Sequence, residues 1–354
     1  MSNFILIAVS MLLLAFLIIT SKRKIFKRIW LRRLVKITMI IAIVIMVLAV
    51  VIFPDLPSVK TTGEYSYTVK TIELTDNSRI EIFKDDGSFR KLSVLVYSPK
   101  TTKKRPLIVF SHGGISTKTS NVSLYAELAS HGYVVVAISH TYHALNTKID
   151  GKNIFINSEY MRELNTENSH KNIENSYALF QKWMNLRTGD INFVIDYFVK
   201  NSEIVDADNI GVAGHSLGGS AALSIARRRS DIKAVLALES PFMGDIIGVD
   251  GDQFLWNTSP YDCAIVNIYS DSGYSLIETD NKYVQNKNNM LNSEKVEYYY
   301  IKGSNHYSLT DLVRKSPLLC KLLGGGYSKS GYETLKFINE KSVAFFDISL
   351  PLDI

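Results

Sequence analysis

The segment Asn209–Ala222, NIGVAGHSLGGSAA, predicts a sharp turn between a buried strand and a closely packed helix. It begins with apolar residues and ends with small residues that start a helix, and the pattern G-x-S-x-G lies between them. Gly214 and Gly218 stand two residues to either side of Ser216, where larger side chains would clash at a tight turn. The segment therefore predicts a nucleophile elbow with Ser216 as the nucleophile, although a plain Gly/Ser turn before a helix is the alternative.

Short apolar runs alternate with helix patterns around this elbow. The runs that fit buried strands are Pro106–Phe110, Tyr133–Ile138, Ile210–Ala213, Ala234–Leu238, Ala264–Tyr269 and Val296–Ile301. Helix patterns cover Val122–Ala129, Ile191–Val199, Leu217–Arg227 and Glu333–Phe346. Earlier alternating stretches at Glu64–Lys70, Arg79–Lys84 and Leu92–Tyr97 suggest antiparallel edge strands. Residues 64–354 are therefore expected to form an α/β-hydrolase fold, a mostly parallel sheet with helices on both faces.

A serine nucleophile needs a base near neutral pH, and in this fold an acid and then a histidine follow the serine. His306 is the only histidine after Ser216, which makes it the predicted general base. Glu239 ends the run AVLAL, and Asp271 follows the run AIVNIYS, so both carboxylates stand at strand ends. Asp245 is a weaker candidate, and the residues alone leave the choice of acid open.

A second loop is expected to complete the site. The sequence SHGG follows the apolar run PLIVF, and its glycines allow the backbone to approach a substrate closely. We expect the backbone N–H groups of Gly114 and Leu217 to form an oxyanion hole. His140 and His143 suggest a metal pair, but no third ligand can be placed, so neither a metal nor a cofactor is expected.

The N-terminal part predicts a membrane anchor over residues 1–53. Two charge-free apolar runs, at 4–20 and 37–53, flank a loop at 21–36 that holds eight Lys and Arg and no acid. Each run approaches the roughly 20 residues that span a bilayer, and basic loops stay cytoplasmic. We therefore expect two transmembrane helices, a stalk at 54–63 and an extracytoplasmic catalytic domain on a multi-pass cell-membrane protein. A cleaved signal peptide is the main alternative.

Charge and cysteine content limit the partners. The chain has 40 Lys and Arg against 34 Asp and Glu, and the basic loop accounts for the whole excess. Nucleic acid is therefore not an expected partner, whereas anionic lipid headgroups suit the loop. No obligate protein partner is implied. The two cysteines, Cys263 and Cys320, allow at most one disulfide, and Cys263 is expected to be a small core residue.

The polar, Asn-rich stretch 141–184 interrupts the alternation of strands and helices. Long insertions are usually lids or binding loops, and aromatic side chains are costly to leave in water. We expect this insertion to form a lid or a pocket wall, with a plain surface excursion as the alternative.

Six segments, in this order, resemble the platelet-activating-factor acetylhydrolases, α/β-hydrolases that release short or oxidised acyl chains from phospholipids. The segments are PLIVFSHGG, LASHGYVVVAISH, RTGDINFVID, GVAGHSLGG, ALES and IKGSNHYSLTDL, within residues 90–315. The resemblance implies a serine esterase with Ser216 as nucleophile, His306 as base, and Gly114 and Leu217 as oxyanion donors. The family's acid is an aspartate at the position of Glu239, so Asp271 stays open.

The resulting expectation is a membrane-anchored serine hydrolase that cleaves a lipidic ester through an acyl-enzyme. A general carboxylesterase and an envelope acyltransferase with the same triad are the nearest alternatives. An inactive hydrolase scaffold that acts as a binding protein is a further alternative, against which an intact Ser216–His306 pair argues.

Overall fold

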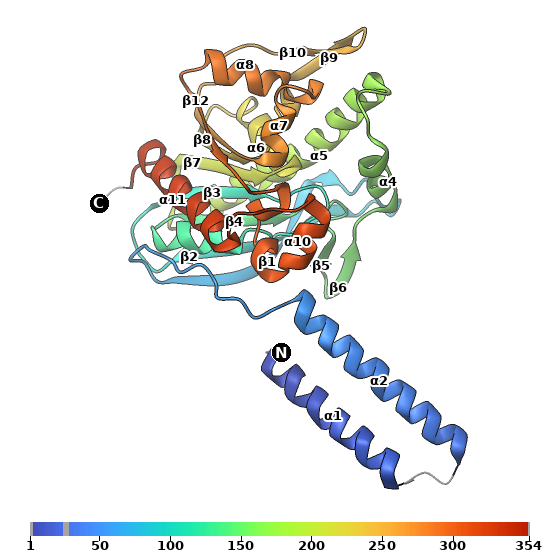
Figure 1. Ribbon diagram of the computed structural model, residues 1–354. Coiled ribbons are helices and arrows are strands. Elements are labelled where there is room, and N and C mark those ends of the chain that lie inside the picture. The colour runs from blue at the N-terminus through green and yellow to red at the C-terminus, as the bar shows by residue number, and fades with distance from the viewer. Residues whose placement is uncertain (1–2, 24–27, 353–354) are drawn as a thin grey trace.

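The structure, a computed structural model, describes residues 3–23 and 28–352 (Figure 1). In this part of the chain the main sheet has eight strands, in the order β1-β2-β4-β3-β7-β8-β11-β12. Their bounds are β1 (Tyr67–Ile80), β2 (Phe89–Pro99), β3 (Arg105–Ser111), β4 (Val134–Ser139), β7 (Val205–His215), β8 (Ile232–Leu238), β11 (Ala264–Ser270) and β12 (Val296–Ile301). β2 pairs antiparallel with β1 and β4, whereas the other neighbours pair parallel. The predicted mostly parallel sheet with an antiparallel edge is confirmed.

Helices pack on both faces of the sheet. In β3, Leu107 and Val109 join a core cluster with α5 (Ile173–Asn201) and α6 (Leu217–Ala226). The alternate residues Ile108 and Phe110 join a second cluster with α3 (Val122–Ser130) and α11 (Gly331–Ser349). Because successive side chains of a strand point to opposite faces, β3 is buried along its whole length, as its continuous apolar run predicts.

The other described elements are short, and several of them come directly after the carboxyl end of a parallel strand. They are β5 (Asn146–Ile149), β6 (Lys152–Phe155), α4 (Ser158–Thr166), β9 (Ile246–Asp250), β10 (Gln253–Trp256), α7 (Asp271–Leu276), α8 (Val284–Asn292), α9 (Leu312–Lys315), α10 (Pro317–Gly324) and the 3₁₀ helices η1 (Met243–Asp245), η2 (Asn281–Tyr283) and η3 (His306–Leu309). Parallel strands that end at one edge bring distant loops together, and this edge carries the residues of the predicted site.

Two secondary-structure predictions are wrong in their limits. Arg79–Lys84 is not a separate strand, because β1 continues to Ile80 and then turns back into β2. The helix predicted at Ile191–Val199 already begins at Ile173. The insertion 141–184 therefore contains the β5–β6 hairpin, α4 and the first turns of α5, and its Tyr160, Phe180 and Trp183 side chains are buried.

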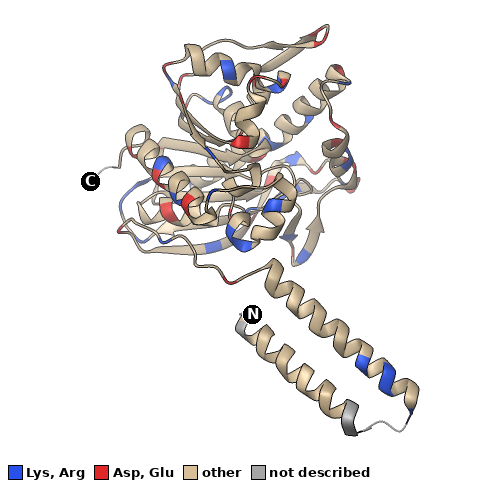
Figure 2. Ribbon diagram, in the orientation of Figure 1, with Lys and Arg blue, Asp and Glu red and all other residues tan. Residues whose placement is uncertain are grey.

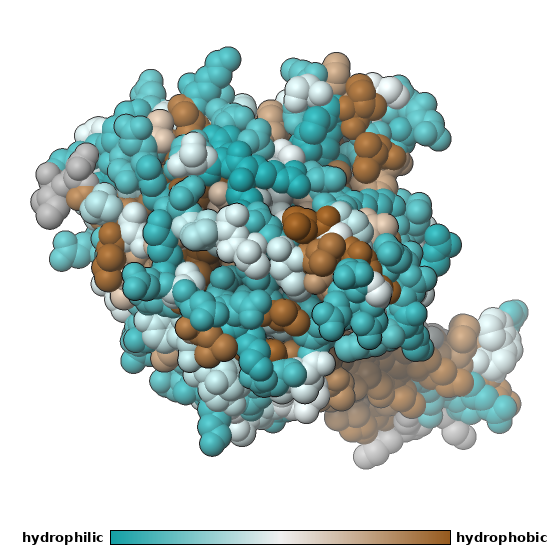
Figure 3. Space-filling view, turned by 90° about the horizontal axis from the view of Figure 1, so that it is seen from above, coloured by the Kyte–Doolittle hydropathy of each residue, from teal (hydrophilic) through white to brown (hydrophobic). Residues whose placement is uncertain are grey.

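The N-terminal part forms two antiparallel helices, α1 (Asn3–Arg23) and α2 (Ile29–Ile52), that lie side by side away from the sheet (Figure 1). Among the described residues, only α2 is long and apolar enough to cross a membrane, and the apolar part of α1, Ile5–Thr20, is shorter. The Lys and Arg residues coloured on the ribbon of these helices lie near the start of α2 (Figure 2). Figure 3 shows the helix pair as an apolar block beside a largely hydrophilic domain surface. An apolar helix near the N-terminus is typical of a membrane anchor or of a signal sequence.

The predicted stalk lies against the domain. Arg314 donates to the Pro57 carbonyl at 2.6 Å, and the Thr62 amide donates to Glu127 at 3.0 Å. Cys263 and Cys320 are both free and buried, so they form no disulfide.

Candidate active site

The elbow between β7 and α6 holds Ser216 in a backbone conformation that a side-chain-bearing residue rarely adopts, with φ 54° and ψ −127°. A Cβ at Gly214 would lie 2.4 Å from the backbone of Gly218. A Cβ at Gly218 would lie 2.0 Å from the Ser111 carbonyl oxygen. Both glycines are therefore required by close backbone approach, which is the physical reason for the spacing in the sequence.

His306 begins η3 just after β12, and its ring faces Glu239 at the end of β8. His306 Nδ1 donates to Glu239 Oε1 at 2.6 Å. The other oxygen, Oε2, accepts from the Ser270 backbone N–H at 2.8 Å and from the Ser270 hydroxyl. Burial alone would raise the pKa of Glu239, but the hydrogen bonds from His306 and Ser270 outweigh it and hold the pKa below its usual value. Glu239 is therefore ionised, and both of its carboxylate oxygens accept hydrogen bonds, one of them from the imidazole.

The two other candidate acids contact different groups. Asp271 accepts from the Tyr300 hydroxyl at 2.6 Å and from the Gly303 backbone N–H at 3.1 Å. Asp245 is buried beside Arg227, with a 2.8 Å contact, and accepts from the Tyr261 hydroxyl. Of the three carboxylates, Glu239 is the one that the fold brings to His306.

Gly273 makes room for the longer acid. A Cβ at this position in α7 would lie 2.3 Å from Cγ of Glu239. Glu239 itself has a positive φ of 51°, in the left-handed region that residues with side chains rarely adopt. The lack of a side chain at Gly273 thus leaves the space that the Glu239 side chain fills.

His215, which precedes Ser216 in the elbow, contacts His306. His215 Nε2 donates to the His306 carbonyl at 3.1 Å, and the two rings lie 4.5 Å apart between centroids. Within the described part of the chain, the structure records no direct hydrogen bond between the Ser216 hydroxyl and the His306 ring. Such contacts often tighten only when a substrate binds.

The predicted oxyanion loop lies directly against the elbow. A Cβ at Gly113 would lie 3.6 Å from Cβ of Ser216. Gly114 is covered by α4, because the Tyr160 hydroxyl donates to the Gly114 carbonyl at 3.3 Å and Leu164 lies nearby. Leu217 is the first residue of α6, where backbone N–H groups have no partner within the helix. The insertion thus supplies part of the wall beside this loop.

Sequence reasoning missed the residues that hold this loop from behind. Arg187 of α5 is fully buried and donates to the carbonyls of His112 and Gly113. One turn later, Asp190 accepts from His140 Nδ1 at 2.9 Å, and His140 Nε2 accepts from the Ser111 hydroxyl at 2.8 Å. The segment RTGDINFVID contains both α5 residues, but nothing in it indicates their partners.

The two histidines considered for a metal have other roles. His140 belongs to the buried chain from Ser111 to Asp190, and burial lowers its pKa to about 4. The His143 ring stacks on Tyr160 with centroids 3.6 Å apart. Among residues 3–23 and 28–352, no group of three or more His, Cys, Asp or Glu could hold a metal ion.

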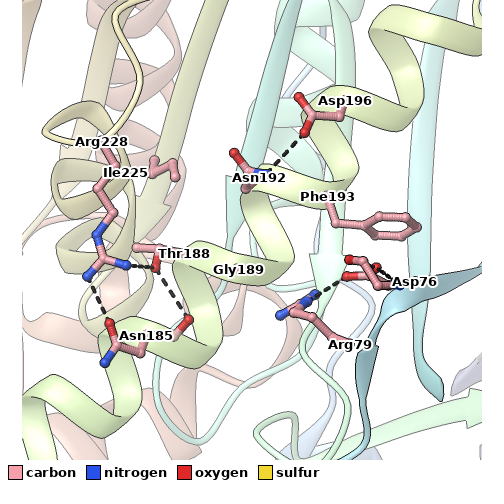
Figure 4. Close-up of a pocket in the computed structure, with 11 residues that line it drawn as sticks. Asp76, Arg79, Asn185, Thr188, Gly189, Asn192, Phe193, Asp196, Ile225 and Arg228 are labelled. Carbon is pink, nitrogen blue, oxygen red and sulfur yellow. Dashed lines mark hydrogen bonds and ion pairs between the residues drawn. The ribbon is translucent and has the colours of Figure 1, made fainter. Parts of the chain in front are cut away.

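One cavity of about 300 Å³ lies away from these residues, between β1 and the α5–α6 pair (Figure 4). It is lined by Arg79, Gly189 and Arg228 among others and by none of the predicted site residues. It is therefore separate from the predicted site.

Solved structures share this architecture. A ferulic acid esterase from Streptomyces cinnamoneus superposes with a TM-score of 0.62 at 20% sequence identity, over 82% of this chain and 92% of that one. The prediction of an α/β-hydrolase fold is thereby confirmed, whereas the two-helix membrane hairpin stays a prediction.

Curated proteins with similar sequences are esterases. The platelet-activating factor acetylhydrolase of Cavia porcellus is 26% identical over 290 residues, 72% of this chain and 59% of its own length. A cutinase, est1, of Thermobifida alba is 26% identical over 148 residues, 40% of this chain and 38% of its own length. The chain thus spans less than two thirds of the length of these relatives. The family model described as "Platelet-activating factor acetylhydrolase, isoform II" matches residues 88–354, so the chain belongs to that family.

Proposed function

We propose that this protein hydrolyses carboxylic esters through an acyl-enzyme on Ser216. The observation that carries the proposal is the His306–Glu239 pair, 2.6 Å apart, beside a serine held at a strained strand-to-helix turn. This combination supplies a nucleophile, a base and an orienting acid at one edge of the sheet. Family membership and the esterase relatives support the same reaction class.

The reaction proceeds in two halves. The Ser216 hydroxyl attacks the ester carbonyl while His306 Nε2 takes its proton, and the Gly114 and Leu217 N–H groups bind the oxyanion. The intermediate collapses, and the leaving alkoxide takes the proton from His306. A water molecule then gives a proton to His306 and attacks the acyl group. The second intermediate collapses as His306 returns that proton to the Ser216 oxygen, which releases the acid and restores Ser216. Glu239 keeps Nδ1 protonated, so that Nε2 remains free to accept a proton.

We further propose that the substrate is a lipidic ester, such as a phospholipid with a short or oxidised acyl chain, and that α1 and α2 anchor the domain in the membrane with the site outside. Two observations support this proposal. α10 contacts α2 and exposes Leu318, Leu322 and Leu323 close to the anchor helices. α10 also packs against η3, which begins with His306, so a lipid surface at α10 would lie near the site.

A fluorophosphonate tests the armed serine. The full chain in detergent is treated with the reagent, and intact mass is measured for the wild type and Ser216→Ala. One adduct that disappears in the variant supports the proposal, and no adduct on folded wild type would favour an inactive scaffold. Phospholipids with short and long sn-2 chains, with and without an added alcohol, then separate a lipid esterase from a general esterase or an acyltransferase.

A further inference from the structure

Arg187 is a buried cation with an unusual set of partners. Its side chain is fully buried, and its guanidinium donates to the His112 carbonyl, to the Gly113 carbonyl at 3.2 Å and to the Tyr160 hydroxyl at 3.3 Å. Across residues 3–23 and 28–352, no carboxylate lies within ion-pair distance of it. Burying a cation without a counter-ion is costly, so its partners have to compensate.

The nearest acid on the same helix is already occupied. Asp190 binds Arg90 Nε at 2.6 Å and Arg79 at 2.8 Å, and it also accepts from His140. Arg79 lines the cavity of about 300 Å³ described above, where it also donates to Asp76 (Figure 4). The charge of Arg187 is therefore directed at the carbonyls of residues 112 and 113 and not at a carboxylate.

These carbonyls determine where the next N–H groups point. In a planar trans peptide, the carbonyl of one residue and the N–H of the next point in opposite directions. The Gly113 carbonyl points to Arg187 and also accepts from His112 Nδ1 at 2.7 Å. The Gly114 N–H, in the same peptide plane, consequently points away from α5, on the side opposite to the guanidinium.

We propose that Arg187 is the positioning residue of the oxyanion hole, because it fixes the 113–114 peptide plane so that the Gly114 N–H faces the substrate carbonyl oxygen. This inference rests on the proposed ester hydrolysis. The guanidinium also polarises that peptide from behind, which strengthens its N–H as a donor to the negative oxygen formed in the transition state. Arg187 itself touches no substrate.

The buried chain from Ser111 to Asp190 supports the same loop at its other end. Arg187 and Asp190 stand one helical turn apart on α5, so a single helix face holds the loop from residue 111 to residue 113. Because α5 is a long helix packed on the sheet, it provides a rigid base for this loop.

The test compares Arg187→Met and Arg187→Lys with Arg105→Met in the full chain in detergent. Arg105 is a matched control, because it is a buried arginine that donates to the Tyr65 hydroxyl at 2.7 Å from the opposite end of β3. Each protein is assayed with a p-nitrophenyl ester and with its thionoester, whose sulfur accepts hydrogen bonds poorly and gains little from an oxyanion hole. Thermal unfolding is measured alongside.

Arg187→Met should lower kcat for the oxygen ester about 100-fold, as a misplaced donor does, with KM nearly unchanged. The ratio of oxygen-ester to thionoester rates should fall by about the same factor, and Arg187→Lys should recover part of both. Arg105→Met should leave the ratio unchanged. A purely structural role would lower both rates equally and leave the ratio constant, which would overturn the inference.

The lysine variant decides the question if Arg187→Met does not fold. A folded Arg187→Lys with wild-type kcat and ratio would refute the inference, and a fall of about tenfold in both would support it. Failure of the proposed function is recognised separately, because wild type would then show neither ester turnover nor a fluorophosphonate adduct.

Discussion

Replacing Glu239 with glutamine keeps the side-chain shape but exchanges one oxygen for an amide NH₂ group. The Ser270 backbone N–H can only donate, so the remaining oxygen must stay at the Oε2 position, 2.8 Å from it. The NH₂ group then faces His306 Nδ1, which has to become an acceptor. The imidazole is forced into the tautomer with its proton on Nε2, and this tautomer cannot accept the proton of Ser216.

The expected loss follows from the tautomer. An imidazole fixed in the wrong tautomer costs about 10⁴-fold in kcat in serine hydrolysis, or about 5 kcal/mol of transition-state stabilisation. KM should change little, because Glu239 is buried behind the ring and does not reach a substrate. Hydrolysis of p-nitrophenyl acetate by the full chain in detergent measures both constants, and circular dichroism checks that the variant is folded.

Asp271→Asn is the matched control, because Asp271 contacts Tyr300 and Gly303 but not His306. We expect its kcat to stay within about threefold of wild type, as for a substitution away from the reacting groups. A Glu239→Gln protein within tenfold of wild type would refute the tautomer argument. An Asp271→Asn loss larger than that of Glu239→Gln would move the acid to Asp271.

Three further predictions concern the elbow, one buried histidine and the topology. Gly218→Ala should lower the free energy of unfolding by about 1–3 kcal/mol and abolish the fluorophosphonate adduct, because its Cβ would lie 2.0 Å from the Ser111 carbonyl; a stable, labelled variant would contradict this. Burial keeps the pKa of His143 well below 6.5, so this imidazole is neutral in the folded protein but becomes protonated in the unfolded chain. As the pH falls below about 6.5, the free energy of unfolding of the wild type should therefore decrease by about 1.4 kcal/mol per pH unit from this one imidazole. His143→Phe retains the stacking on Tyr160 and should remove that slope in urea titrations at pH 7, 6 and 5; an unchanged slope would mean that His143 is protonated in the fold. A protease added outside intact cells should cleave beyond Pro54, and complete protection would reverse the proposed topology.

Local features were predictable from the sequence, and long-range ones were not. The elbow follows from glycine spacing within five residues, and β12 lies where its apolar run predicts, at Val296–Ile301. The acid could not be chosen from the sequence, because Glu239 and Asp271 both stand at strand ends. Only the fold brings Glu239 next to His306, which lies 67 residues further along the chain. Arg187 could not be recognised either, because backbone carbonyls 74 and 75 residues away are its main partners and carry no sequence signal.

Besides the proposed catalytic residues, the molecule contains another serine, histidine and carboxylate joined in one hydrogen-bonded chain. Ser111, His140 and Asp190 have the connectivity of a catalytic triad, with distances of 2.8 and 2.9 Å, yet all three are sealed from solvent. Ser111 lies in regular strand geometry inside β3, whereas Ser216 has a positive φ and is partly exposed. Connectivity alone therefore does not make a nucleophile in this protein. Access to a substrate and a backbone turn that presents the hydroxyl distinguish the proposed reactive serine from its buried counterpart. Reagents that must enter the site should therefore label Ser216 and leave Ser111 unmodified.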